Sequence, residues 1–103
     1  MTKNISNHEA HRLIKNGAIV IDIRDAKDFG VSHIPGALNI SINALDKIYL
    51  DKKQPIIVVC SHGIRSIAAA ERLMELGFIN VYNLANGYDN FRQWTTLQLG
   101  LSF

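Results

Sequence analysis

The sequence has one cysteine, Cys60, and the residues that follow it are of types that activate a thiol. Cys60 ends the unbroken apolar run of residues 56–59 and begins the segment Cys-Ser-His-Gly-Ile-Arg-Ser. The thiolate, and not the thiol, is the nucleophilic form of cysteine. The reactivity of Cys60 therefore depends on how strongly the following residues favour the negatively charged sulfur.

Residues 61–66 bring several groups that stabilise negative charge. The pattern predicts a strand that ends at Cys60, a tight loop, and a helix that begins near Arg65. The first turn of a helix has free backbone N–H groups and the positive end of the helix dipole, and successive loop amides can form an anion-binding nest. Gly63 permits a backbone conformation that a side chain resists, and Arg65 adds a fixed positive charge. We therefore predict that the pKa of the Cys60 thiol lies well below its ordinary value, which makes Cys60 a nucleophile at neutral pH.

The alternative role of Cys60 is that of a buried structural residue, since free cysteine is among the most buried residue types. Gly63 and Arg65 at a turn from strand to helix favour the functional role. A thiolate in such a loop suits sulfur transfer, phosphate-ester hydrolysis or arsenate reduction. In a domain this small we expect the thiol to lie near the surface, where an acceptor molecule can reach it.

Polar residues in and near this loop have candidate roles of their own. His62 can tune the thiolate or contact an anionic donor, and it can equally be a solvated side chain. The Ser61 and Ser66 hydroxyl groups can donate hydrogen bonds to the sulfur, although for Ser66 we favour a bond to the helix backbone. Asp22 and Arg24, near a strand end, are expected to form an ion pair that organises the loops rather than a catalytic pair.

Three histidines outside the loop are expected to have no catalytic role. His33 lies next to a Pro-Gly turn and is predicted to hold loop backbone through its ring nitrogens. His8 and His11 are three residues apart on the first predicted helix. No thiol or carboxylate completes a metal-binding set with them, so the pattern favours a surface pair, and no metal is expected.

The last stretch of the sequence is apolar. We expect Trp94 and Leu97 to pack on the core as part of a final helix. For residues 99–103 two interpretations are open, a tail folded over the core or an exposed patch for a partner or a dimer.

The elements that hold these residues alternate along the chain. Strands are predicted at residues 19–23, 37–40, 56–59 and 81–84. Helices are predicted at residues 6–16, 25–29, 41–49 and 65–76, and after Gly87. An apolar run without polar alternation is typical of a strand buried on both faces, as in a parallel sheet. The alternation predicts an α/β fold, and in such sheets ligands bind beyond the carboxyl ends of the strands, where Cys60 lies.

Composition sets broad limits on the class of protein. With 103 residues, of which 48% are hydrophobic and 19% charged, residues 1–103 are expected to form a single domain. The 11 basic and 9 acidic residues give a net charge of +2, too small an excess to predict nucleic-acid binding. No apolar run suits a signal peptide or a membrane span, so no membrane partner is expected. A single cysteine excludes an internal disulfide and a multi-thiolate zinc site, and it suits the reducing cytoplasm.

Taken together, these segments resemble the single-domain rhodaneses, a family of thiosulfate and persulfide sulfurtransferases. The segment from Cys60 to Ser66 matches the family's active-site pattern C-x-x-G-x-R-[SA]. Further segments resemble its other motifs in the same order, at residues 21–25, 32–37, 76–84 and 84–88. Ser32 departs from the glycine of the family's GHIPGA motif, and Asn86 from the first glycine of its LxGG motif. The resemblance implies a three-layer α/β fold with a mostly parallel central sheet of about five short strands flanked by helices.

The resemblance also implies a mechanism that needs no cofactor. Cys60 attacks the outer sulfur of a donor such as thiosulfate and carries it as a persulfide, until cyanide, a small thiol or a protein thiol removes it. In the family, backbone amides of the loop hold the persulfide, and here these amides belong to Ser61, His62, Gly63, Ile64 and Arg65. Because the chain has no second cysteine, the sulfur has to leave to another molecule.

Two other functions stay open at this point. Relatives that act as phosphatases or arsenate reductases resemble C-x5-R, whereas only four residues separate Cys60 from Arg65, and the shorter loop favours a sulfur atom. A catalytically weak binding or regulatory module is the other alternative, and the intact Cys60 and Arg65 argue against it. The physiological donor, the acceptor and the oligomeric state are also open.

Overall fold

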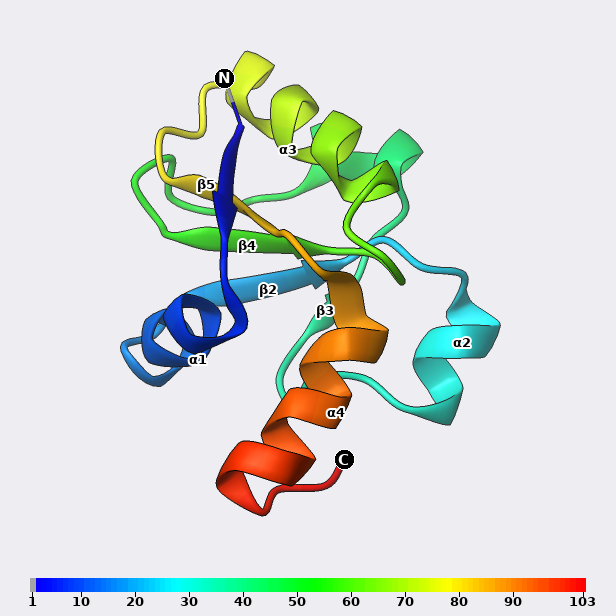
Figure 1. The fold of residues 1–103 in the computed structure, drawn as a ribbon. Helices are drawn as coiled ribbons and strands as arrows, with labels where there is room; N and C mark the ends of the chain where they lie inside the picture. The colour runs from blue at the N-terminus through cyan, green and yellow to red at the C-terminus, as the bar shows by residue number, and fades with distance from the viewer. Residues whose placement is uncertain (1) are drawn as a thin grey trace.

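Five parallel strands form one sheet at the centre of the computed structural model, which describes residues 2–103. The strands are β1 (Lys3–Ile5), β2 (Ile19–Asp22), β3 (Leu38–Asn39), β4 (Ile56–Val59) and β5 (Val81–Leu84), in the spatial order β1-β5-β4-β2-β3. The helices are α1 (Asn7–Lys15), α2 (Ala26–Val31), α3 (Arg65–Glu75) and α4 (Gly87–Leu99), with a 3₁₀-helix, η1, at Ile42–Lys47. The predicted α/β fold with a parallel sheet is confirmed (Figure 1).

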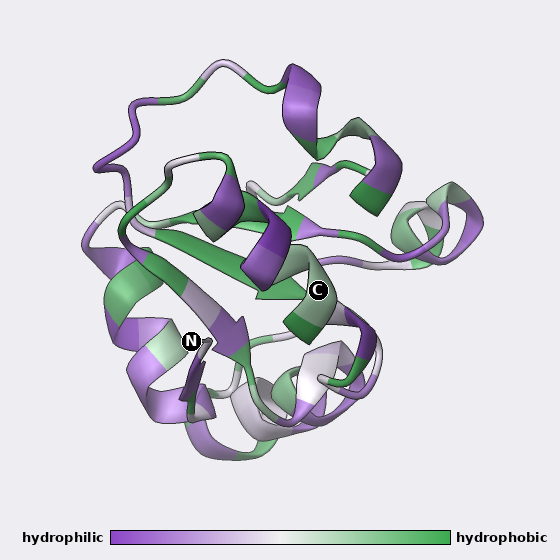
Figure 2. Cartoon of the chain, turned by 90° about the horizontal axis from the view of Figure 1, so that it is seen from above, coloured by the Kyte–Doolittle hydropathy of each residue, from purple (hydrophilic) through white to green (hydrophobic). Residues whose placement is uncertain are grey.

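The central strand β4 shows how the sequence builds both faces of the sheet. Its side chains are all buried, because successive residues of a strand point to opposite faces and both faces are covered. Ile57 and Val59 pack on one face, and Ile56 and Val58 pack on the other. Viewed from above, the central strands are mostly in the green of hydrophobic residues, whereas purple segments gather on the surrounding helices and loops (Figure 2).

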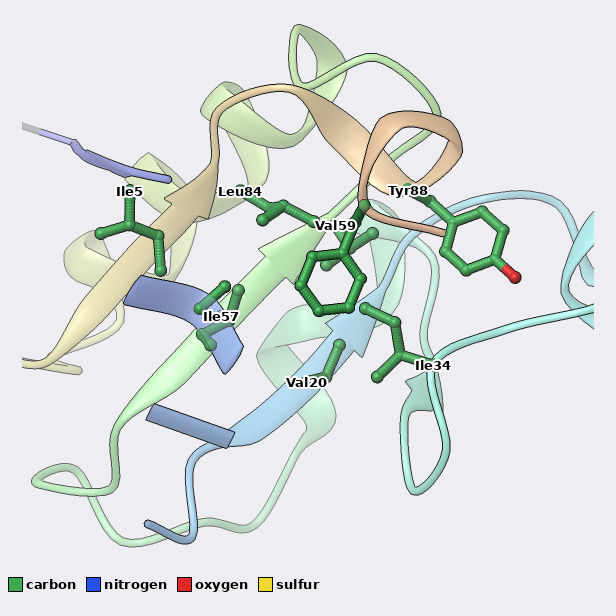
Figure 3. Packing of buried hydrophobic residues seen from close by; sticks show 9 residues of the cluster. Ile5, Val20, Ile34, Ile57, Val59, Leu84 and Tyr88 are labelled. Carbon is green, nitrogen blue, oxygen red and sulfur yellow. The ribbon is translucent and has the colours of Figure 1, made fainter. Parts of the chain in front are cut away.

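Helices cover both faces of the sheet and give the molecule three layers. On one face lie α1 and α4, and Tyr88 of α4 packs there in one cluster with Val20 and Val59 (Figure 3). On the other face lie α3 and η1, whose Leu73 and Leu45 pack on strand side chains. The segment that follows β4 leaves the sheet at the carboxyl edge of the strands. Both α3 and α4 begin at this edge (Figure 1).

Two elements differ from the sequence-based expectations. The edge strand β1 was not predicted from the sequence. It has only three residues and one buried side chain, Ile5, so its sequence carries little strand signal. This strand forms by parallel pairing with β5, in which Lys3 is the partner of Tyr82. Residues 42–47 form a short 3₁₀-helix where a longer helix over residues 41–49 is predicted.

The apolar end of the chain is packed in part. Trp94 packs against the core, as expected, but Leu97 is 80% exposed, so its predicted burial is wrong. Helical periodicity places Leu97 on a different face of α4 from the buried Phe91. The ring of Phe103 lies 6.4 Å from the ring of Phe91 and 6.4 Å from the ring of Tyr88, so the last residue folds back over the core.

Candidate active site

Cys60 follows β4 directly, and the loop after it wraps around its sulfur. The sulfur accepts hydrogen bonds from the backbone N–H groups of Gly63, at 3.2 Å, and of Ser66 in the first turn of α3, at 3.3 Å. Cys60 is 1% exposed. It contributes to a pocket of ≈ 340 Å³ with Ser61, His62, Ile64 and Arg65. The loop folds over the sulfur and buries Cys60, but the residue still contributes to a pocket, so the access of an acceptor to the thiol stays a prediction.

Two opposing effects set the protonation of this thiol. Burial raises the pKa of Cys60, because it disfavours the charged form. Hydrogen bonds with the Ser66 side chain and with the backbone N–H groups of Ser66, His62 and Gly63 lower that pKa. The hydrogen bonds outweigh burial, and the pKa of the Cys60 thiol lies below its ordinary value, in the predicted direction.

We expect the Cys60 thiolate to form at a lower pH in the folded protein than in the unfolded chain. Titration of the ultraviolet absorbance of the thiolate, corrected with a Cys60→Ser variant, measures the folded-state pKa, and the same titration in urea supplies the reference. Between these two pKa values the folded protein has released a proton that the unfolded chain still holds, so the free energy of unfolding rises with pH. That contribution is complete above the unfolded-state pKa and is lost as the pH falls to the folded-state pKa. A folded-state pKa equal to or above the value in urea would contradict the hydrogen-bond arrangement.

A buried polar residue of β5, Asn83, is connected to the sulfur through Ser66. The Ser66 hydroxyl lies 3.2 Å from the Cys60 sulfur and donates a hydrogen bond to Asn83 Oδ1, so the expected bond from Ser66 to its own helix backbone is replaced. The Asn83 side-chain amide donates to the Gly63 carbonyl oxygen and to Asn4 Oδ1, both at 2.9 Å. Asn83 is absent from the residues expected at the site, although an asparagine in a short buried strand signals a buried hydrogen bond.

Backbone N–H groups at the N-terminus of α4 donate hydrogen bonds to carbonyl groups of the same loop. The Tyr88 N–H donates a hydrogen bond to the Cys60 carbonyl oxygen at 2.8 Å, and the Asp89 N–H donates one to the Ser61 carbonyl oxygen at 3.3 Å. The first residue of the helix, Gly87, packs directly on the Ser61 carbonyl. Because loop carbonyl groups bind α4, loop N–H groups are left free on the side of the sulfur.

The mouth of the pocket carries positive charge and free donors. The Arg65 side chain is exposed, and it has no ion-pair partner among residues 2–103. His62 is also exposed, and its Nε2 atom lies 3.4 Å from Asp89 Oδ2. In the described part of the chain, the backbone N–H groups of Ile64 and Arg65 have no acceptor. Free donors and a cation at one pocket are the groups that bind a small anion.

Asp22 and Arg24 form the expected ion pair, and it is buried. Arg24 Nη2 lies 2.8 Å from Asp22 Oδ2, and the two side chains are 5% and 1% exposed. The guanidinium also donates to the Ser32 carbonyl oxygen at 2.8 Å and lies over the Tyr88 ring, 4.0 Å from its centroid. Burial acts to lower the pKa of Arg24, but the hydrogen bonds and charge of Asp22 raise it above its ordinary value. Tyr88 therefore connects the ion pair to the Cys60 loop. Its ring contacts Arg24, and its backbone N–H donates a hydrogen bond to the Cys60 carbonyl oxygen.

The other histidines lie away from the loop. His33 Nδ1 is 2.8 Å from the Phe29 carbonyl oxygen, which confirms the predicted backbone contact, and its ring stacks on the Phe29 ring. The rings of His8 and His11 lie edge-on to Trp94, at 6.5 Å and 6.0 Å between centroids. Within residues 2–103, His, Cys, Asp and Glu side chains form no group of three or more that could hold a metal ion.

Comparisons with known proteins agree with this geometry. A family model described as "Rhodanese-like domain" matches residues 6–93. "Thiosulfate sulfurtransferase GlpE" of Coxiella burnetii (strain RSA 331 / Henzerling II) is 40% identical over 95 residues, which cover 89% of this chain and 89% of that relative. The protein of the same name from Ectopseudomonas mendocina (strain ymp) is 39% identical over 92 residues, which cover 87% of this chain and 84% of that relative.

A solved structure shows the same fold. "Human Single Domain Sulfurtransferase TSTD1" superposes with a TM-score of 0.81, covering 90% of this chain and 97% of that chain at 22% sequence identity. The family match spans most of the sequence and includes the Cys60 loop. The chain therefore belongs to the rhodanese-like domain family.

Proposed function

We propose that the protein is a sulfurtransferase that carries sulfane sulfur on Cys60 from a donor such as thiosulfate to cyanide, a small thiol or a protein thiol. One observation carries the proposal. A single cysteine has its sulfur surrounded by N–H donors, in a loop with four residues between Cys60 and Arg65. Relatives named thiosulfate sulfurtransferase, at 36% to 40% identity over most of the chain, support the same activity.

The reaction consists of two displacements at sulfur. The Cys60 thiolate attacks the outer sulfur of thiosulfate, and as the new S–S bond forms, the bond to the sulfonate sulfur breaks and sulfite leaves with its electron pair. The acceptor then attacks the outer sulfur of the persulfide. Cyanide becomes thiocyanate in this step, and the Cys60 thiolate leaves with the electron pair of the broken bond and is restored. No external oxidant or reductant is consumed.

The loop supplies electrostatic stabilisation in both steps. The N–H groups of Gly63 and Ser66 hold the thiolate and then the inner sulfur of the persulfide. The N–H groups of Ile64 and Arg65, without acceptors among residues 2–103, receive the outer sulfur or the departing sulfite. The Arg65 guanidinium attracts the anionic donor to the pocket, and His62 adds to this attraction when it is protonated.

Intact-mass measurement after incubation with thiosulfate tests the proposal. We expect the wild-type protein to gain the mass of one sulfur atom, and the Cys60→Ser variant to gain none. Addition of cyanide to the loaded protein should remove the sulfur and release thiocyanate. If neither thiosulfate nor glutathione persulfide leaves an adduct, the protein is a binding module instead. Hydrolysis of an aryl phosphate without any sulfur adduct would identify a phosphatase.

We further propose that residues 1–103 act as a single domain in the reducing cytoplasm, where a lone thiol stays available. Both core clusters pack on the same sheet, which supports a single domain. No helix within residues 2–103 is long and apolar enough to span a membrane. The partners of this reaction are a small sulfur donor and a thiol or protein acceptor, and the net charge of +2 gives no reason to add a nucleic acid.

A further inference from the structure

Asn83 is a buried polar residue beside the active loop to which the proposed reaction assigns no role. It lies on β5 and is 1% exposed. Its side chain accepts a hydrogen bond from the Ser66 hydroxyl and donates to the Gly63 carbonyl oxygen and to Asn4 Oδ1. A buried amide with partners on both its oxygen and its nitrogen is held in one orientation.

The Gly63 carbonyl determines that orientation. A carbonyl oxygen only accepts hydrogen bonds, so the atom of Asn83 that faces it at 2.9 Å has to be the nitrogen. The oxygen of Asn83 then faces Ser66, and the Ser66 hydroxyl has to donate to it. When Cys60 ionises, this hydroxyl proton is therefore shared between the sulfur and Asn83.

The same bond sets the direction of one peptide group in the loop. In a trans peptide, the C=O of one residue and the N–H of the next point in opposite directions. The peptide bonds among residues 2–103 are all trans, and a positive φ of 84° at Gly63 brings its carbonyl to Asn83. The N–H of Ile64 therefore points away from Asn83, and it has no acceptor within the described residues.

We propose that Asn83 is a positioning residue, which holds the Gly63 carbonyl and thereby turns the Ile64 N–H towards the sulfur pocket. Ile64 contributes to that pocket together with Cys60. The N–H dipole of Ile64 then faces the pocket and favours negative charge there, without a hydrogen bond to the Cys60 sulfur itself. The role at the persulfide rests on the proposed function, whereas the effect on the free thiol does not depend on sulfur transfer.

Removal of the Asn83 side chain has two opposing effects on the thiol. The peptide between Gly63 and Ile64 becomes free to rotate, and when the Ile64 N–H dipole turns away from the pocket, the pKa of Cys60 rises. The Ser66 hydroxyl is released from Asn83 at the same time, and its fuller donation to the sulfur lowers that pKa. A Ser66→Ala background removes the second effect and leaves the first to be measured alone.

The test compares the Ser66→Ala variant with the Ser66→Ala/Asn83→Ala double variant by the thiolate titration. We expect the pKa of Cys60 to rise by about half a unit in the double variant, which is about threefold less thiolate at a pH below the pKa. Asn4→Ala in the same background is the matched control, because it removes the other acceptor of Asn83 and leaves the Gly63 bond. This control should keep the pKa of its Ser66→Ala parent. An unchanged pKa in the double variant, or an equal rise with Asn4→Ala, overturns the proposal.

Amide NMR spectra recorded during the same titration report on Ile64 directly. In the Ser66→Ala protein the proton shift of the Ile64 N–H should follow the ionisation of Cys60, and in the double variant it should not. The spectra also show whether the double variant is folded. If it is unfolded, Asn83→Leu replaces Asn83→Ala, because the leucine side chain is close in size to asparagine and has no group that can donate to Gly63. If the proton shift of the Ile64 N–H still follows the ionisation of Cys60 in the folded variant, the proposal is overturned. The absence of a thiosulfate adduct would contradict only the proposed function.

Discussion

Replacement of Asp22 by alanine is expected to lower the free energy of unfolding by about 3–5 kcal/mol. The cause is Arg24, which stays buried and loses the carboxylate that binds it at 2.8 Å. Its remaining partners, the Ser32 carbonyl and the Tyr88 ring, carry no charge that could replace the carboxylate. Urea denaturation measures the change. Since a domain of this size is stable by only about 5–15 kcal/mol, such a loss is a large fraction of the total.

An exposed ion pair of the same protein provides the control for this prediction. Arg72 and Glu75 lie 3.5 Å apart and are 47% and 68% exposed, so Arg72→Ala should change the stability by less than about 1 kcal/mol. The double substitution Asp22→Leu with Arg24→Met should recover much of the loss, because no unpaired buried charge is left. If Asp22→Ala costs no more than Arg72→Ala, the buried pair does not stabilise the protein in the way the structure indicates.

Replacement of Gly63 by alanine is expected to reduce the rate of sulfur transfer by about 100-fold and the free energy of unfolding by about 2–5 kcal/mol. Gly63 has a φ of +84°, and a Cβ atom there would overlap the Ala85 carbonyl oxygen and lie 2.9 Å from the Leu84 carbonyl oxygen. These are backbone atoms at the end of β5, so the loop itself has to move. Its N–H, now 3.2 Å from the Cys60 sulfur, moves with it. Rates of thiocyanate formation and urea denaturation measure the two effects.

Gly36 offers a matched control for this substitution. Its φ is +83°, nearly that of Gly63, but no heavy atom lies within 4 Å of a Cβ built on it. Gly36→Ala therefore carries the same conformational cost, about 1–2 kcal/mol, without the overlap. It should leave the rate of sulfur transfer close to that of the wild type. Equal losses of transfer in both variants would mean that contact with β5 does not position the active loop.

Local sequence was sufficient to predict the fold class, the loop that surrounds Cys60 and the direction in which the pKa of this thiol shifts. The apolar run of residues 56–59 has no polar alternation. Such a run is typical of a strand whose side chains are buried on both faces of a parallel sheet, as they are here. The donors to the Cys60 sulfur, Gly63 and Ser66, follow it within six residues, so a short motif already contains them. The pairing of Asp22 with Arg24 was predictable for the same reason, since only one residue separates them along the chain.

Interactions between distant segments could not be predicted in this way. The strand β1 exists through its pairing with β5, and its own three residues carry little signal. The exposure of Leu97 depends on which face of α4 docks on the sheet. The cation–π contact between Arg24 and Tyr88 likewise joins segments that meet only when α4 packs beside the end of β2.

The sequence by itself therefore determined the fold class, the position of Cys60 at the end of a strand and the loop that follows it. The tertiary structure alone decided how that loop is held. Asn83 reaches Gly63 because β5 pairs in register with β4, with Asn83 beside Val58, and Tyr88 reaches the Cys60 carbonyl because α4 begins against the loop. The physical reason is that hydrogen bonds between segments far apart in sequence depend on strand register and helix docking, which no local pattern of residue types specifies.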